Sequence, residues 1–260
     1  MKRPTKTAIV TGATSGMGSE MIKHVISRGE GYDEIWVLGR REERLAAWQE
    51  AYPDIRFRTF VLDLASAGER DKFGALLREE KPQISLFVHA AGFGIMGMID
   101  EISVEDQEEM TEVDVTACVS LTSYVLPFMK EGGQMIYFAS AAAFLPQPGF
   151  AVYAACKAFV LSYVRALRAE NRNRKLKITA VCPGAVKTEF LDRATGNRAL
   201  PAYKQLVLAR PSSVVRKAWK DNRRNREISV YGLPMKLFFL ATKILPHRCF
   251  LTFLGRRRND

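Results

Sequence analysis

Residues Thr5 to Gly18 read TKTAIVTGATSGMG and join a short apolar run to a glycine-rich turn. Thr5 to Thr11 suits a buried strand, and Ser19 to Ser27, behind the turn, has its apolar side chains at helical spacing. A dinucleotide site needs this order of strand, glycine turn and helix, because glycines let the backbone approach a pyrophosphate and the helix N-terminus offers unpaired N–H groups. The spacing is G-x-x-x-G-x-G, so the commoner G-x-G-x-x-G fingerprint fits only loosely. The stretch therefore indicates the first strand and helix of a nucleotide-binding α/β fold.

Short apolar runs alternate with helical patterns along the rest of the chain. The predicted strands are residues 7–11, 35–38, 58–62, 86–89, 134–139, 177–182 and 228–231. Strands that alternate with helices predict right-handed crossovers and a parallel sheet covered on both faces. No linker, low-complexity tract or repeat interrupts the pattern. We therefore predict a single α/β domain, a Rossmann-type doubly wound parallel sheet, with its ligand beyond the carboxyl ends of the strands.

A second motif lies in the second half of the chain. Tyr153 and Lys157 are four residues apart, and Ser140 lies thirteen residues before the tyrosine. On a helix, residues four apart share one face, so the ammonium group can sit beside the phenol. A free phenol titrates near pH ~10, and we expect the cation to move its pKa toward the working range. With a serine hydroxyl on the same substrate oxygen, this trio can pass a proton to or from a carbonyl oxygen.

Taken in order, these motifs resemble the short-chain dehydrogenase/reductase family. TGATSGMG matches the family's T-G-x-x-x-G-x-G turn, and Tyr153 with Lys157 matches its Y-x-x-x-K, with Ser140 at the usual separation. VCPGAVKT, Val181 to Thr188, is similar to the family's P-G-x-V-x-T segment, and the resemblance covers about residues 5 to 232. It implies that Tyr153 donates the proton, that Ser140 binds the same oxygen, and that Lys157 lowers the tyrosine pKa and binds the cofactor ribose.

The resemblance also implies a nicotinamide dinucleotide site. Its expected residues are Gly12, Thr14, Ser15, Gly16, Met17, Gly18, Arg40, Arg41, Asp63, Leu64, Ala90, Ala91, Gly92, Tyr153, Lys157, Pro183, Gly184, Val186 and Thr188. Asp63 and Leu64 resemble the pair that contacts adenine, while Val186 and Thr188 would hold the nicotinamide amide.

The choice of cofactor depends on the end of the second predicted strand, which runs into Arg40 and Arg41. An NAD-preferring site places an acidic residue there for the ribose 2′-hydroxyl, whereas guanidinium groups match a 2′-phosphate. We therefore predict NADP(H). The alternative is that the two arginines form a solvated turn before the next helix.

Two positions depart from the family pattern. His89 replaces the first asparagine of the usual N-N-A-G segment, and we expect it to pack beside the adenine pocket. Asp114 stands where the family's catalytic tetrad has asparagine, whose backbone carbonyl helps to hold a water in the proton relay. An aspartate keeps that carbonyl but places a negative charge near Lys157, and its ionised side chain only accepts hydrogen bonds.

Composition gives no sign of a metal or a disulfide framework. Cys118, Cys156, Cys182 and Cys249 show neither C-x-x-C nor Cys/His ligand spacing, and the three histidines are scattered. No secretory signal precedes the first strand, so we expect reduced thiols in a cytoplasmic protein and no metal site.

The net charge of +11 is unevenly distributed. Residues 1–164 hold 16 basic and 22 acidic residues, whereas residues 165–260 hold 23 basic and 6 acidic residues. Such asymmetry points to an anionic partner. No recognisable nucleic-acid-binding module accompanies the basic half, so we do not expect nucleic acid as that partner.

Residues 233–260 form an apolar and basic extension after a catalytic unit of residues 1–232. Lys236, Lys243 and Pro246 interrupt its apolar residues, whereas a membrane-spanning helix needs ~20 nearly uncharged residues. Two interpretations stay open. The extension packs over the substrate cleft or a subunit partner, or it lies as a basic amphipathic segment on an anionic bilayer as a peripheral membrane contact. We favour the first.

These observations predict an enzyme that reduces a ketone or aldehyde with NADPH, or oxidises an alcohol in reverse. Apolar residues at 93–99 and 141–150 suggest a lipophilic substrate such as a steroid, an acyl or a 3-oxoacyl group. Residues 189–210 are the predicted substrate lid, and we expect a homodimer or homotetramer. The alternative is a non-catalytic NADP(H)-binding or membrane-associated protein on the same fold, for which Asp114 is the only support.

Overall fold

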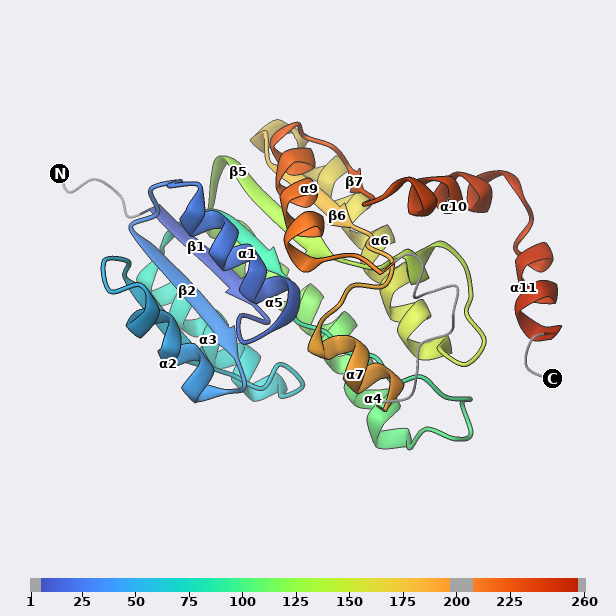
Figure 1. Ribbon diagram of the computed structural model, residues 1–260. Coiled ribbons are helices and arrows are strands. Elements are labelled where there is room, and N and C mark those ends of the chain that lie inside the picture. The colour runs from blue at the N-terminus through green and yellow to red at the C-terminus, as the bar shows by residue number, and fades with distance from the viewer. Residues whose placement is uncertain (1–5, 197–207, 257–260) are drawn as a thin grey trace.

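Seven parallel strands form the central sheet of the computed structural model, which describes residues 6–196 and 208–256 (Figure 1). The strands are β1 (Lys6–Thr11), β2 (Glu34–Gly39), β3 (Phe57–Val61), β4 (Gln83–His89), β5 (Met129–Phe138), β6 (Lys177–Val181) and β7 (Ile228–Ser229). Their order across the sheet is β3-β2-β1-β4-β5-β6-β7. The chain thus begins in the middle, reaches one edge, and returns past β1 to the other edge. The predicted doubly wound sheet is confirmed, although Thr5, which we placed in the first strand, lies outside the described residues.

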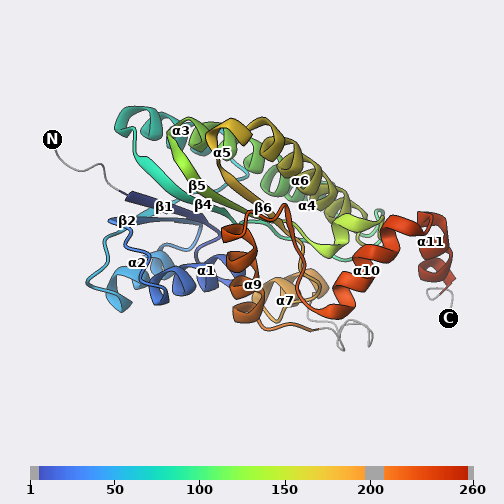
Figure 2. The same ribbon diagram turned by 90° about the horizontal axis from the view of Figure 1, so that it is seen from above.

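Helices cover both faces of this sheet (Figure 2). The helices of the described residues are α1 (Gly16–Ser27), α2 (Glu42–Ala51), α3 (Ala67–Glu80), α4 (Val104–Thr111), α5 (Ala117–Val125), α6 (Ala151–Glu170), α7 (Glu189–Thr195), α9 (Pro211–Arg223), α10 (Leu233–Ile244) and α11 (His247–Arg256). Helices α1, α2 and α9 lie on one face, and α3, α5 and α6 lie on the other. Helices α10 and α11 extend from the end of the molecule opposite the N-terminus (Figure 1).

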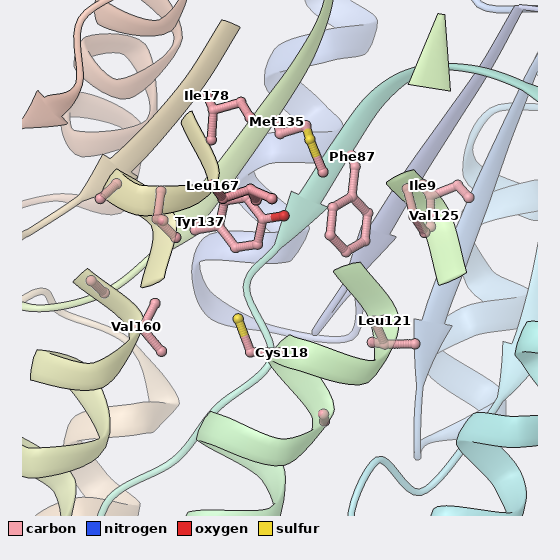
Figure 3. Packing of buried hydrophobic residues seen from close by; sticks show 14 of the residues in the cluster. Ile9, Phe87, Cys118, Leu121, Val125, Met135, Tyr137, Val160, Leu167 and Ile178 are labelled. Carbon is pink, nitrogen blue, oxygen red and sulfur yellow. The ribbon is translucent and has the colours of Figure 1, made fainter. Parts of the chain in front are cut away.

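Alternation along the strands divides the core into two layers. Ile9 of β1 faces α3, α5 and α6, while its neighbours Ala8 and Val10 face α1 and α9. Figure 3 shows the first layer, in which the ring of Tyr137 packs between the strands and the helices. The Tyr137 hydroxyl lies 2.9 Å from the Thr122 hydroxyl, so this buried polar group keeps a hydrogen-bond partner.

Besides β4, which begins at Gln83 rather than residue 86, two strands differ from their predicted bounds by more than one residue. β5 begins at Met129 rather than Gln134, because the chain passes Gly132 and Gly133 with a shift of register against β4 and still pairs before the irregularity. β7 ends at Ser229 rather than Tyr231, and Gly232 then turns the chain into α10. Neither difference moves the carboxyl ends of β1, β4, β5 and β6, where the predicted site residues lie.

Candidate active site

A cleft of about 1060 Å³ opens at the carboxyl ends of the central strands. It gathers residues from the glycine turn, the ends of β2 to β6, α6 and α7. Every residue predicted for the cofactor lines this cleft except Gly18. Ser140, Tyr153 and Lys157 line it as well, so the two sequence motifs meet in one cavity. The ligand site therefore lies where an open α/β sheet places it, next to the strand order reversal between β1 and β4.

The glycine turn combines a special backbone conformation with close packing. Gly12 has a φ of +65°, and a Cβ there would lie 2.8 Å from the backbone nitrogen of Ala91. Gly18 is buried under the turn, where a Cβ would meet the backbone of Gly12 and Thr11. Gly18 therefore allows α1 to pack closely against β1, and it is the one predicted cofactor residue that does not line the cleft. The first turn of α1 has no side-chain cap, so its N–H groups are available for an anion.

Thr11 joins the ends of β1 and β4. Its hydroxyl oxygen accepts hydrogen bonds from the N–H groups of Ala90 and Ala91, both at 3.0 Å, and lies 3.3 Å from Nδ1 of His89. With both N–H donors pointing at this oxygen, the Thr11 hydroxyl donates its own proton to Nδ1. Burial, reinforced by the charge of Lys157, lowers the pKa of His89 to about 3, so the ring is neutral. The ring of His89 packs against the rings of Phe87 and Tyr137 in the core, next to Ala90 of the cleft, and does not itself line the cleft.

Tyr153 and Lys157 lie on one face of α6, as their spacing predicts. The Lys157 ammonium is 5.5 Å from the centroid of the Tyr153 ring. Ser140, after the end of β5, accepts a hydrogen bond from the Ala142 N–H at 3.1 Å, and its hydroxyl group acts to lower the pKa of Tyr153. Phe150 stacks on the tyrosine ring with a centroid distance of 4.3 Å and so fixes its orientation. The three predicted residues are thus brought together.

The pKa of Tyr153 differs from our expectation. Burial raises this pKa above its ordinary value, and the charge of Lys157 only opposes the rise. The carboxylate of Asp114 adds to the rise by partly cancelling the lysine charge. A buried phenol that stays protonated at neutral pH suits a proton donor better than a base.

Asp114 lies behind Lys157 rather than in the cleft. It belongs to a short π-helix, η1 (Glu112–Thr116), between α4 and α5. The Lys157 ammonium donates to Asp114 Oδ1 at 3.3 Å and to the Phe138 carbonyl at 3.2 Å. Burial raises the pKa of Asp114 to about 6, although Lys157 and the Phe93 N–H oppose the rise. Its other oxygen, Oδ2, has no hydrogen-bond partner in the described part of the chain. Asp114 therefore reaches the cleft through Lys157, which makes it a positioning residue.

The arginines after β2 converge on the rim of the cleft. Arg41 donates to Thr14 Oγ1 at 3.1 Å and to Glu189 Oε2 at 2.8 Å. Arg44, which sequence reasoning missed, donates to Glu189 Oε1 at 2.7 Å. Glu189 therefore bridges two guanidinium groups, which lower its pKa. Arg40 pairs instead with Glu109 at 3.0 Å. The position of Arg44, one helical turn after Arg41, was the sequence signal for this second arginine.

The opposite half of the cleft is apolar. Its walls are formed by Phe93, Met96, Val113, Leu145, Phe150, Phe190, Leu191, Met235, Phe238 and Phe250. Met235 and Phe238 come from α10, and Phe239 of the same helix packs on Phe144 with a centroid distance of 4.7 Å. Arg193 of α7 lies at this end too, stacked 3.8 Å above the Phe93 ring. The first residues of the predicted lid form helix α7. Residues 197–207 of that lid lie outside the described residues.

Comparison with known proteins agrees with this geometry. The family described as short chain dehydrogenase matches residues 6–199. The chain is 31% identical over 236 residues to the NADP-dependent 3-hydroxy acid dehydrogenase of Escherichia coli K12, covering 87% of this chain and 93% of that protein. It is 29% identical over 195 residues to serine 3-dehydrogenase of Agrobacterium fabrum, covering 74% and 77%. Among solved structures, a short-chain dehydrogenase from Sphingobium yanoikuyae in complex with NADPH superimposes with a TM-score of 0.80 at 26% identity, covering 93% and 92%.

A doubly wound parallel sheet that carries a nucleotide turn and a tyrosine–lysine pair in one cleft defines a class of oxidoreductases. The family match assigns the chain within that class. It belongs to the short-chain dehydrogenase/reductase family, as the sequence motifs predicted.

Proposed function

We propose that this protein reduces a ketone or aldehyde with NADPH, or oxidises the corresponding alcohol with NADP⁺. The observation that carries the proposal is the meeting of Ser140, Tyr153 and Lys157 with the glycine turn in one cleft. Names of relatives support the cofactor, since one is an NADP-dependent dehydrogenase and another was solved in complex with NADPH. The roles of the individual site residues, the lid function of α7, a homo-oligomer and a cytoplasmic location are parts of the same proposal.

The residues present fit a dinucleotide. The uncapped N-terminus of α1 would hold the pyrophosphate, Arg41 and Arg44 would hold a 2′-phosphate, and Lys157 would hold the ribose hydroxyls. Bound there, NADPH would supply a hydride to the carbonyl carbon. Tyr153 would donate its proton to the carbonyl oxygen as negative charge develops, and Ser140 would hydrogen-bond that oxygen. Donors aimed at developing charge stabilise the transition state more than the ground state.

Preference for NADPH tests the two arginines. We expect NADPH to bind at least about tenfold more tightly than NADH, because charge-assisted hydrogen bonds are worth ~1.5–3 kcal/mol each before solvent screening. Arg41→Ala and Arg44→Ala should each weaken NADPH binding by about tenfold and leave NADH binding unchanged. Fluorescence titration with both cofactors measures this. Arg56→Ala, just before the amino end of β3 and outside the cleft lining, controls for the lost charge. Equal affinity of the wild type for NADPH and NADH contradicts the prediction.

Asp114→Asn tests the pair behind the tyrosine. The Asp114 charge raises the pKa of Tyr153, so its removal should lower that pKa and move the pH profile of alcohol oxidation to lower pH. Activity at the optimum should stay within about tenfold of wild type, because the backbone carbonyl is kept and acid–base assistance survives. The measurement is kcat/KM against pH. Glu105→Gln, an exposed change on α4, should leave the profile in place, and a profile of Asp114→Asn that stays fixed or moves upward refutes the coupling.

The apolar wall supports a lipophilic substrate such as a steroid or an acyl or 3-oxoacyl group. Arg193 favours a second class, because a guanidinium at the substrate end can pair with a carboxylate. The Escherichia coli relative is named for activity on 3-hydroxy acids, which carry such a carboxylate.

NADPH oxidation with matched ketones that carry or lack a terminal carboxylate separates the two substrate classes. If NADPH binds tightly but every ketone and aldehyde is inert, the non-catalytic alternative replaces the proposal.

A further inference from the structure

Helix α10 has two apolar faces, and only one of them is buried. The inner face places Met235 and Phe238 in the cleft wall, with Thr242 buried beside them. The outer face carries large apolar side chains at intervals of four, three and four residues. They are Leu233, Leu237, Leu240 and Ile244, which are 68%, 58%, 55% and 70% exposed. At 3.6 residues per turn these positions form one stripe along the helix, which we call the outer stripe.

The outer stripe is bordered by positive charge. Lys236 and Lys243 are exposed, and the helical period places both on the same side of the stripe. The sequence contains no aspartate or glutamate from residue 228 to residue 259. Leu245, the residue that follows α10, is 48% exposed and extends the apolar surface toward α11. The surface around the stripe is therefore apolar and cationic, and residues 228–259 supply no carboxylate to neutralise the lysines.

This combination points away from a second copy of the chain. A two-fold interface brings the same patch of both subunits together, and with the two copies of α10 antiparallel the lysines beside the stripe would face each other. Without carboxylates on residues 228–259, such an interface would place like charges opposite one another in a partly desolvated setting. An anionic bilayer surface can bind both features, because its acyl region buries the apolar stripe and its anionic headgroups pair with the lysines.

We propose that the outer stripe docks the protein on an anionic lipid bilayer. No helix among the described residues is long and apolar enough to cross a membrane, so α10 would lie in the plane of the interface. Its inner face would still form the wall of the cleft, which places the apolar half of the cleft close to the bilayer surface. The two interpretations of residues 233–260 are then compatible, because each uses a different face of one helix. Bilayer binding does not require the proposed reaction, and the two can fail separately.

Flotation of the full-length protein with vesicles tests the proposal. Vesicles of phosphatidylcholine with about 30% phosphatidylglycerol should bind the protein at low salt, and binding should fall steeply at about 0.5 M salt, where the Debye length is only ~4 Å. Pure phosphatidylcholine vesicles should bind at least about tenfold less. Leu237→Asp/Leu240→Asp and Lys236→Glu/Lys243→Glu should each reduce binding to the anionic vesicles at least about tenfold.

Matched variants separate the outer stripe from the net charge. Lys23→Glu/Lys220→Glu makes the same change of charge on α1 and α9, and Ile99→Asp removes an apolar side chain that is 65% exposed elsewhere. Both should float like the wild type, and all four variants should keep NADPH affinity and circular dichroism. Lack of wild-type binding, or equal loss in Lys23→Glu/Lys220→Glu, overturns the proposal. So does a smaller oligomer for Leu237→Asp/Leu240→Asp in sedimentation velocity, which would assign the stripe to a second copy.

Discussion

Tyr153→Phe should lower kcat for carbonyl reduction by about a hundredfold to ten-thousandfold and leave the Kd of NADPH within about threefold of wild type. The substitution removes one hydroxyl group, the proposed proton donor, and keeps the ring that stacks on Phe150. The substrate oxygen would then take its proton from water, while Ser140 and Lys157 stay in place. Steady-state turnover and fluorescence titration of NADPH measure the two quantities separately.

Tyr163→Phe is the matched control for this loss. Tyr163 lies on the same helix, stacks on Phe159 and does not line the cleft, so its hydroxyl should be dispensable for turnover. If Tyr153→Phe retains more than a tenth of the wild-type kcat, Tyr153 is not the proton donor.

Gly18→Ala should lower the free energy of unfolding by about 2–4 kcal/mol and weaken NADPH binding at least about tenfold. A Cβ at this position would lie 2.7 Å from the carbonyl carbon of Gly12 and 2.8 Å from the carbonyl oxygen of Thr11. Both contacts are with backbone, so no side chain can rotate away to relieve them. Helix α1 must shift, and the nucleotide turn moves with it. Urea denaturation and NADPH titration report the two effects.

Gly68→Ala provides the comparison. Gly68 lies in the first turn of α3, and a Cβ there meets nothing within 4 Å. Alanine should raise the free energy of unfolding by up to about 1 kcal/mol, because it restricts the unfolded chain and favours helix. Equal stability of the Gly18→Ala and Gly68→Ala proteins would show that α1 packs less tightly on β1 than the structure indicates.

The sequence predicted the sheet well because buried parallel strands are short apolar runs with few alternatives. β1, β2 and β6 lie within a residue or two of their predicted bounds. β5 was predicted too short because its first residues, Met129 to Gly133, contain two glycines and a lysine, which do not read as strand. Only the register with β4 keeps that segment in the sheet, and register is a long-range property.

The candidate site was predictable where a motif fixes residues along the chain. Tyr153 and Lys157 share a helix, so their spacing alone places them together. Glu189 and Arg41 are far apart in the sequence, and no local pattern could pair them. The high pKa of Tyr153 also depends on burial by Phe150, at the start of the same helix, and by Phe190 of α7, which is distant in the sequence. Contacts between distant segments, and the burial that these contacts cause, could therefore not be predicted from the sequence.

Helix α10 shows a different limit. Its sequence has apolar residues around most of the helix, so the pattern does not reveal which face the protein buries. The phenylalanines Phe238 and Phe239 turn inward, whereas the leucines at 237 and 240 turn outward. We weighed cleft and membrane as exclusive alternatives because the sequence gives no way to assign the two faces.

The π-helix at Glu112–Thr116 sets the rotational phase between α4 and α5. A π turn holds one residue more than an α turn, so α4 is rotated by about 100° from where an unbroken α-helix would place it. Deleting a single residue in this segment would restore a regular helix but turn Met110 of α4 out of the core, or turn Asp114 away from Lys157. The segment therefore tolerates changes of side chain more readily than changes of length, which is a practical limit for grafting or shortening this part of the fold.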